Sequence, residues 1–151
     1  MSKNLNQYVV FKLGEESYGV DILQVKTIER LMPITRVPKA PKFVEGVINL
    51  RGEVVPVIDL RKRFDLEQKD ASDNTRIIII NVDGITVGMI VDSASEVIQI
   101  PVDEIEPPPA IVGSIDSDYI SGVGKVGERL LILLNLKKVL KSKEIEQLEK
   151  I

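Results

Sequence analysis

Few side chains in this sequence could carry out catalysis. The 151 residues include no His, no Cys and no Trp, and most zinc sites and nucleophilic triads depend on His or Cys. Two carboxylate pairs could in principle act as acid and base, Asp103 with Glu104 and Asp116 with Asp118. Both pairs fall in segments that contain Pro, Gly or Ser, where carboxylates commonly face water. We therefore predict no catalytic residues, no metal site and no cofactor.

Two other patterns are typical of phosphate chemistry. Residues 122–127 (GVGKVG) match the G-x-G-x-x-G loop that binds dinucleotides at a helix N-terminus. Residues 128–136 (ERLLILLNL) are predicted to form a strand instead, so no helix dipole would face a phosphate. Asp83 follows an apolar strand, as a phosphoacceptor does, but Asp83-Gly84 is a strong hairpin-turn signal. Phosphotransfer is not expected, and a small-ligand or nucleotide-binding β-barrel remains an alternative interpretation.

The elements that would position any site show an internal duplication. Residues 44–60 (VEGVINLRGEVVPVIDL) recur in outline at 120–136 (ISGVGKVGERLLILLNL) without a gap. A second, weaker repeat precedes each copy and pairs Val9, Phe11, Leu13 and Gly19 with Ile78, Ile80, Val82 and Gly88. A repeat this long suits a duplicated small domain better than a solenoid. We expect lobes at about 8–64 and 76–140 and a polar joint at 65–75, with exchange of strands between the lobes left open.

Most of the chain is predicted to form short strands. The expected strands are Tyr8–Leu13, Ser17–Val20, Val44–Asn49, Val54–Asp59, Arg76–Val82, Ile85–Val91, Glu96–Ile100 and Arg129–Leu134. Many short strands with few helices favour barrels or a sandwich. After Asp21, a possible N-cap, residues 22–28 fit either a helix or a strand. Pro56 suggests an edge strand, and residues 136–151 are predicted to form a C-terminal helix after Asn135.

Composition narrows the class of protein. At 44% hydrophobic residues the chain can fold, and its apolar runs are too short to span a bilayer. A net charge of −3 argues against a nucleic-acid groove, and the basic cluster Arg61–Arg63 is interpreted as a solvated face. The N-terminal residues do not resemble a secretory signal, and no disulfide is possible without Cys, so we expect a cytoplasmic location.

The repeated blocks also resemble a known family. Residues 43–52 (FVEGVINLRG), followed by 54–60 (VVPVIDL), are similar to the signature of the CheW family of chemotaxis coupling proteins. The blocks 18–22, 87–92 and 130–135 resemble the family's other motifs in order, so that the resemblance covers about Tyr8 to Leu140. It implies a single CheW-like domain over 1–151, mainly β, with two small five-stranded barrels of SH3/OB-like type facing each other across a groove.

The resemblance also implies function and partners. It predicts a non-enzymatic adaptor that joins the cytoplasmic tips of methyl-accepting chemoreceptors to the histidine kinase CheA, through the regulatory domain of CheA. Such an adaptor would be recruited to membrane-associated receptor arrays without inserting into the membrane and without binding nucleic acid. A CheW-like regulator of another kinase pathway, for example one that controls pili, is the alternative.

Site residues follow from the same resemblance. The predicted receptor-binding residues are Val25, Thr27, Ile28, Gly46 and Arg51, and the predicted kinase-binding residues are Glu106, Pro107, Pro109 and Ile111. Val25 and Ile28 could instead be core residues, and Gly46 could serve only a tight backbone path. Some family members have an acidic residue at the position of Thr27, and this chain has Glu29 nearby. Arg51 is the strongest candidate, because its duplicated counterpart, Gly127, carries no charge.

Overall fold

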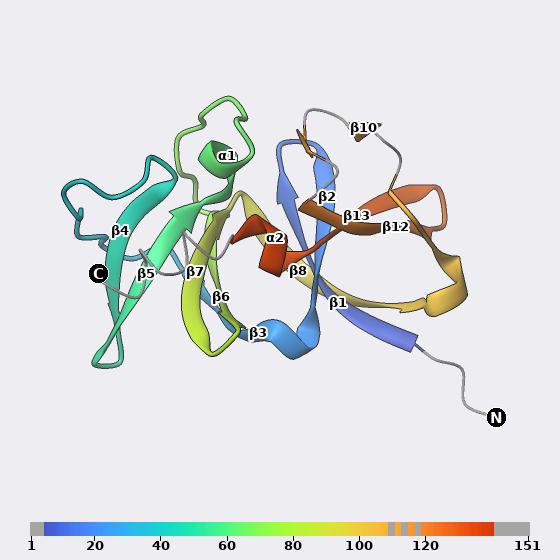
Figure 1. The fold of residues 1–151 in the computed structure, drawn as a ribbon, viewed down its shortest axis with the longest axis horizontal. Helices are drawn as coiled ribbons and strands as arrows, with labels where there is room; N and C mark the ends of the chain where they lie inside the picture. The colour runs from blue at the N-terminus through green and yellow to red at the C-terminus, as the bar shows by residue number, and fades with distance from the viewer. Residues whose placement is uncertain (1–4, 109–110, 113–114, 117–118, 141–151) are drawn as a thin grey trace.

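The chain folds mainly as strands in two sheets that lie side by side (Figure 1). The computed structural model describes residues 5–108, 111–112, 115–116 and 119–140. The strands are β1 Leu5–Leu13, β2 Glu16–Asp21, β3 Val25–Arg30, β4 Val44–Leu50, β5 Glu53–Asp59, β6 Arg76–Val82, β7 Ile85–Val91, β8 Ser93–Pro101, β9 Ile105–Glu106, β10 Ile111–Val112, β11 Ile115–Asp116, β12 Ile120–Val126 and β13 Arg129–Leu134. The described helical turns are η1 Ile22–Gln24, α1 Leu60–Arg63, η2 Val102–Glu104 and α2 Leu136–Val139.

Each sheet takes strands from both halves of the sequence. Sheet A has the order β8-β1-β2-β13-β12-β9, and sheet B has the order β3-β6-β7-β5-β4. The duplication pairs β1 and β2 with β6 and β7, and β4 and β5 with β12 and β13. With these equivalences the two sheets share one strand order, and both contain a parallel pair, β13 with β2 and β5 with β7. The halves have therefore exchanged their first hairpins, so the segments 8–64 and 76–140 do not coincide with the sheets.

Both sheets close into small barrels. In sheet A the chain continues from β8 through η2 into β9, which pairs with β12 through Glu106 and Val123. In sheet B the chain beyond β3 returns to β4, where Thr35 and Val47 exchange two backbone hydrogen bonds of 2.8 Å. Closure leaves few free strand edges for unwanted pairing. The prediction of a mainly β fold with few helices is confirmed, and the predicted pair of five-stranded barrels matches approximately, because sheet A has six strands and sheet B has five.

Three apolar cores hold the barrels together. The clusters inside the barrels are Tyr8, Val10, Ile100, Leu131 and Leu133 in sheet A and Ile48, Val55, Val57, Ile77 and Ile79 in sheet B. The largest cluster draws residues from both sheets, including Val9, Phe11, Tyr18, Ile58, Ile78, Ile80 and Leu134, and so lies between the barrels. Successive strand residues point to opposite faces. The unbroken apolar run 77–80 therefore serves two cores at once, its odd-numbered residues facing into one barrel and its even-numbered residues facing the other barrel.

Local capping explains the short helical turns. The side chain of Asp21 accepts a hydrogen bond of 2.9 Å from Leu23 N and starts η1, after which the chain enters β3. The ambiguous segment 22–28 is thus a single helical turn followed by a strand. The duplicated residues Asp59 and Asn135 are the N-caps of α1 and α2, where their side chains accept from Arg61 N and Lys138 N, respectively. The predicted C-terminal helix begins at Leu136 as expected, and residues 141–151 lie outside the described part of the chain.

One prediction about the sheet is wrong. Pro56 suggested an edge strand, but β5 lies between β7 and β4 in sheet B. The parallel ladder of β5 with β7 covers only Val57 to Asp59. Pro56 precedes that ladder, so an interior strand can contain a residue that lacks a backbone donor.

Candidate functional site

The structure brings together residues from two of the segments that the sequence assigned to receptor binding. Thr27 and Ile28 lie on β3, while Arg51 lies in the turn between β4 and β5. Arg51 reaches β3 through an ion pair of 3.5 Å with Glu29. Ile28 is 42% exposed and is one of several large apolar side chains that strands of this protein present to solvent. The exposed strand β3 together with Arg51 is here called the β3 face; along it Thr27 and Glu29 point to one side of the strand and Ile28 points to the other.

Arg51 is held in a conformation that its residue type does not favour. The turn has φ of 52° at Arg51 and 87° at Gly52, the two left-handed residues of a type I′ hairpin. Another two-residue hairpin, between β6 and β7, places Asp83 and Gly84 at these positions, with φ of 52° and 83°. Asn, Asp and Gly suit the first of these positions, and another residue costs about 1–2 kcal/mol. Nothing in the turn requires an arginine.

The ion pair of Arg51 does not account for that cost. The side chain of Arg51 is 69% exposed, and its 3.5 Å separation from Glu29 is long. Exposed pairs of this kind contribute about 0–1 kcal/mol. The guanidinium is therefore positioned by Glu29 on the β3 face but remains accessible to a partner, and strained residues of this kind cluster at binding sites.

Val25 and Gly46 are placed differently from the rest of the predicted receptor set. Val25 is half-buried and packs against the core between the barrels. Gly46 is buried with φ of 150°, and a Cβ there would lie 2.1 Å from the carbonyl oxygen of Thr35. Only glycine, which has no Cβ, lets the backbone of β4 approach Thr35 closely enough for Thr35 and Val47 to pair. For these two residues a receptor contact remains a prediction, and the geometry gives both a packing role.

The predicted kinase-binding residues lie on the other barrel. Glu106 ends β9 on sheet A, is exposed, and makes an ion pair of 2.8 Å with Lys125 on β12. The hydrogen bond from Lys125 to Glu106 raises the pKa of Lys125. Pro107 is exposed beside it. The backbone of Ile111 pairs with that of Asp116, and Pro109 lies outside the described residues. The two predicted partner surfaces therefore belong to different barrels.

A largely buried ion pair next to sheet B is linked to sheet A through the β1–β2 turn. Arg61 of α1 donates to Asp92 from Nε at 2.9 Å and from its terminal nitrogen at 2.5 Å, and Gly14 N donates to the same carboxylate at 2.7 Å. The side chains of Arg61 and Asp92 are only 13% and 17% exposed. Burial alone would raise the pKa of Asp92, but the hydrogen bonds from Arg61 and Gly14 outweigh it and hold this pKa below its usual value.

The interpretation of Arg61–Arg63 as a solvated face is wrong for both arginines. Arg63 lies over the rings of Phe43 and Tyr119, at 4.9 Å and 5.0 Å from their centroids, and its Nε donates to the carbonyl of Val139 at 2.7 Å. Guanidinium groups that stack on aromatic rings are stabilising when desolvated. Both arginines fix α1 between the barrels, and only the intervening Lys62 is exposed.

The candidate acids show no arrangement for catalysis within the described residues. Asp103 and Glu104 are exposed on η2, and Asp118 lies outside the described part. In the same part of the chain no three His, Cys, Asp or Glu side chains gather as metal ligands. The glycine run 122–127 forms most of β12 and turns into β13, so no helix follows it. Among these residues no helix is long and apolar enough to span a bilayer.

Known proteins are similar to this chain in both sequence and architecture. The family model of the CheW-like domain matches residues 7–144. The chain is 39% identical to "Chemotaxis protein CheW" of Klebsiella aerogenes, over 92% of this chain and 84% of that protein, and 42% identical to the protein of the same name in Bacillus subtilis, over 91% and 88%. The crystal structure of scaffolding protein TtCheW from Thermoanaerobacter tengcongensis superposes with a TM-score of 0.86, at 39% identity, covering 95% of this chain and 92% of that one. The chain therefore belongs to the CheW family and is a chemotaxis coupling adaptor.

Proposed function

We propose that this adaptor is non-enzymatic and couples the cytoplasmic tips of methyl-accepting chemoreceptors to the regulatory domain of the histidine kinase CheA. The receptor tip would bind the β3 face on sheet B, and the kinase would bind sheet A around Glu106 and Pro107. The adaptor would act in the cytoplasm, where these partners recruit it to membrane-associated receptor arrays.

The observation that carries the receptor assignment is the ion pair with Glu29 that places Arg51 beside β3, the strand that also carries the exposed Ile28. A receptor tip is a helical element, and an amphipathic helix binds through an apolar anchor together with polar contacts at its rim. Ile28 offers the anchor, and Arg51 offers a residue type enriched in binding hot spots. Glu29 holds Arg51 next to β3, so little side-chain freedom is lost on binding.

The contacts between the two barrels support coupling between the proposed receptor surface on one barrel and the proposed kinase surface on the other. The barrels share one buried core and are joined by Arg61, Asp92 and the β1–β2 turn. Because such packed contacts resist continuous deformation, a receptor bound to one barrel can bias the position of a kinase bound to the other. Coupling free energies between two sites are typically about 1–3 kcal/mol.

Calorimetric titrations test both contacts separately. The protein is titrated first with the regulatory domain of CheA from the same cell and then with a receptor-tip fragment. Saturable binding near micromolar, about −8 kcal/mol, is expected in each case. Arg51→Glu should weaken only the receptor titration, and Glu106→Lys should weaken only the kinase titration. Absence of binding to both partners would contradict the proposal and direct attention to another kinase pathway.

A further inference from the structure

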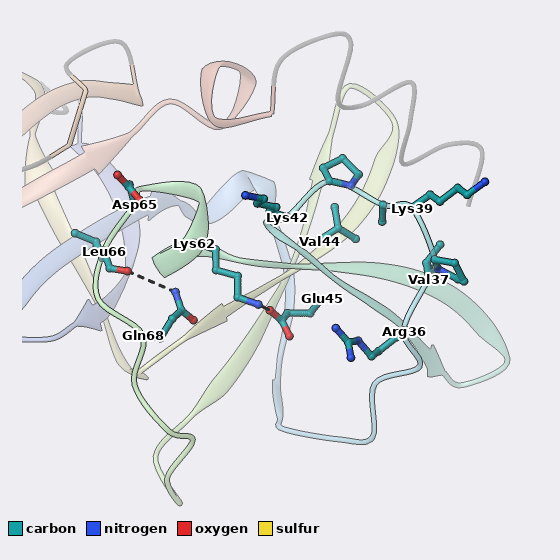
Figure 2. A pocket seen from close by; sticks show the side chains of 13 residues that line it. Arg36, Val37, Lys39, Lys42, Val44, Glu45, Lys62, Asp65, Leu66 and Gln68 are labelled. Carbon is teal, nitrogen blue, oxygen red and sulfur yellow. Dashed lines mark hydrogen bonds and ion pairs between the residues drawn. The ribbon is translucent and has the colours of Figure 1, made fainter.

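A basic groove lies on sheet B, apart from the β3 face and from Glu106. The loop 36–42 between β3 and β4 forms one wall, and Lys62 on α1 forms the other together with Asp65, Leu66 and Gln68 (Figure 2). The cavity volume is about 820 Å³. Apolar side chains, among them Val37, Val44 and Leu66, line part of it. A groove that is lined in part by apolar side chains can take the apolar face of an amphipathic segment.

Four basic side chains, Arg36, Lys39, Lys42 and Lys62, line the groove together with two acidic ones, Glu45 and Asp65, and of the four only Lys62 is paired within the described part of the chain. Lys62 lies 2.5 Å from the buried Oε1 of Glu45, in an ion pair without hydrogen-bond geometry. Arg36, Lys39 and Lys42 are exposed and have no hydrogen bond or ion pair from their side chains to the described part of the chain. A protein of net charge −3 thus gathers three uncompensated cations on one short loop.

The loop is fixed in place before any partner arrives. Thr35 and Val47 bond at one end, and Val44 N donates to Pro41 O at 2.9 Å at the other. Pro38 and Pro41 restrict the backbone between these ends. Lys39 nevertheless has φ of 63°, a left-handed conformation that few residues other than Gly, Asn or Asp adopt. A rigid loop with a strained lysine at its tip loses little entropy when it binds.

We propose that this groove is a third docking surface, which takes an acidic, amphipathic segment of a protein partner. The three loop cations would meet carboxylates of the segment, and its apolar side chains would pack on Val37 and Leu66. Nucleic acid and lipid surfaces are disfavoured because the chain is acidic overall and the groove is short and partly apolar. The surface is independent of the receptor and kinase contacts, so its test needs neither partner.

The test is fluorescence anisotropy with a labelled model peptide of about 18 residues, with glutamates on one helix face and leucines on the other. Saturable binding that weakens with added salt is expected. The variant Arg36→Gln/Lys39→Gln/Lys42→Gln should bind roughly tenfold more weakly, and Lys42→Gln alone about two- to threefold more weakly. The matched control Lys12→Gln/Lys26→Gln/Arg30→Gln removes the same charges from exposed sites outside the groove and should change binding less than about twofold.

Three results would overturn the proposal. One is an equal loss of affinity in the control variant, which would show a response to net charge alone. Another is equal affinity for a peptide with glutamine in place of every glutamate. The third is binding as tight to oligothymidine or to phosphatidylglycerol vesicles as to the acidic peptide, which would show a general polyanion site. Thermal melts of each variant verify that the changed proteins remain folded.

Discussion

Replacing Asp92 with Ala should destabilise the protein far more than breaking an exposed ion pair. The carboxylate of Asp92 accepts hydrogen bonds from Arg61 Nε, from a terminal nitrogen of Arg61 and from Gly14 N. Its loss leaves a guanidinium that is only 13% exposed without its counter-ion. Removing one partner from a fully buried pair costs about 3–5 kcal/mol. Because Arg61 keeps a bond to Glu67 O and some contact with water, we expect about 2–4 kcal/mol.

The pair Arg129–Glu96 provides a matched comparison. Its separation is 2.9 Å, but its side chains are 48% and 40% exposed. Glu96→Ala should therefore cost no more than about 1 kcal/mol. Urea denaturation followed by circular dichroism measures both free energies of unfolding, and the melting temperature should fall by about 2–4 °C for each kcal/mol lost.

The dependence on pH gives an independent check. The pKa of Asp92 is lower in the folded protein than in the unfolded chain, where it is about 3.9. The stabilisation from its charge is therefore complete above about pH 4 and is lost as the pH falls through the folded pKa. The stability difference between the parent protein and Asp92→Ala should shrink in that acidic window. Equal costs for Asp92→Ala and Glu96→Ala at neutral pH would refute the argument that burial makes the Arg61 pair important.

Three further predictions concern single positions. Gly46→Ala should destabilise the protein by several kcal/mol, because the new Cβ would overlap the backbone of Thr35. Gly52→Ala should cost only about 1–2 kcal/mol, because φ is 87° but the new Cβ would meet nothing within 4 Å. Urea denaturation measures both costs, and similar values would contradict the distinction between steric overlap and backbone strain. Asp59→Asn should keep the cap of α1, because Asn135 caps α2. Burial raises the pKa of Asp59, so the free energy of unfolding of the variant should rise relative to that of the parent as pH rises through that pKa. A gain in stability confined to low pH would contradict this prediction. Arg51→Glu should lower receptor-tip affinity by roughly tenfold or more while the melting temperature stays nearly constant, and a large fall in melting temperature would assign Arg51 a structural role instead.

Local sequence signals predicted the strands and turns well. Asp83-Gly84 forms the expected hairpin, and the duplicated capping residues Asp59 and Asn135 begin equivalent helical turns. These signals depend on a few neighbouring residues, whose backbone preferences are the same in any fold. The resemblance to the CheW family added what local patterns could not, namely a pair of barrels and an adaptor function.

Features that depend on distant contacts were missed or left open. The alternation of apolar residues is the same whether β1 and β2 pair with their own half or with the other, so the sequence could not reveal the hairpin exchange. Arg61 and Arg63 read as a solvated cluster because their acceptors and aromatic partners are remote in sequence. The three cations of the loop 36–42 were not predicted as a site, because an arginine and two lysines interspersed with prolines match no recognised motif.

The hairpin exchange also constrains the order in which the protein can assemble during synthesis. Every strand of sheet B lies between Val25 and Val91, so this barrel can form once those residues have left the ribosome. Sheet A joins β1 and β2, the first strands made, to β12 and β13, the last. The N-terminal hairpin must therefore wait for almost the entire chain, and pairings so distant in sequence form slowly. Until β13 has been made, a nascent chain of this protein carries a completed barrel beside an apolar hairpin that lacks its parallel partner strand, and such transiently exposed strand edges are prone to aggregate.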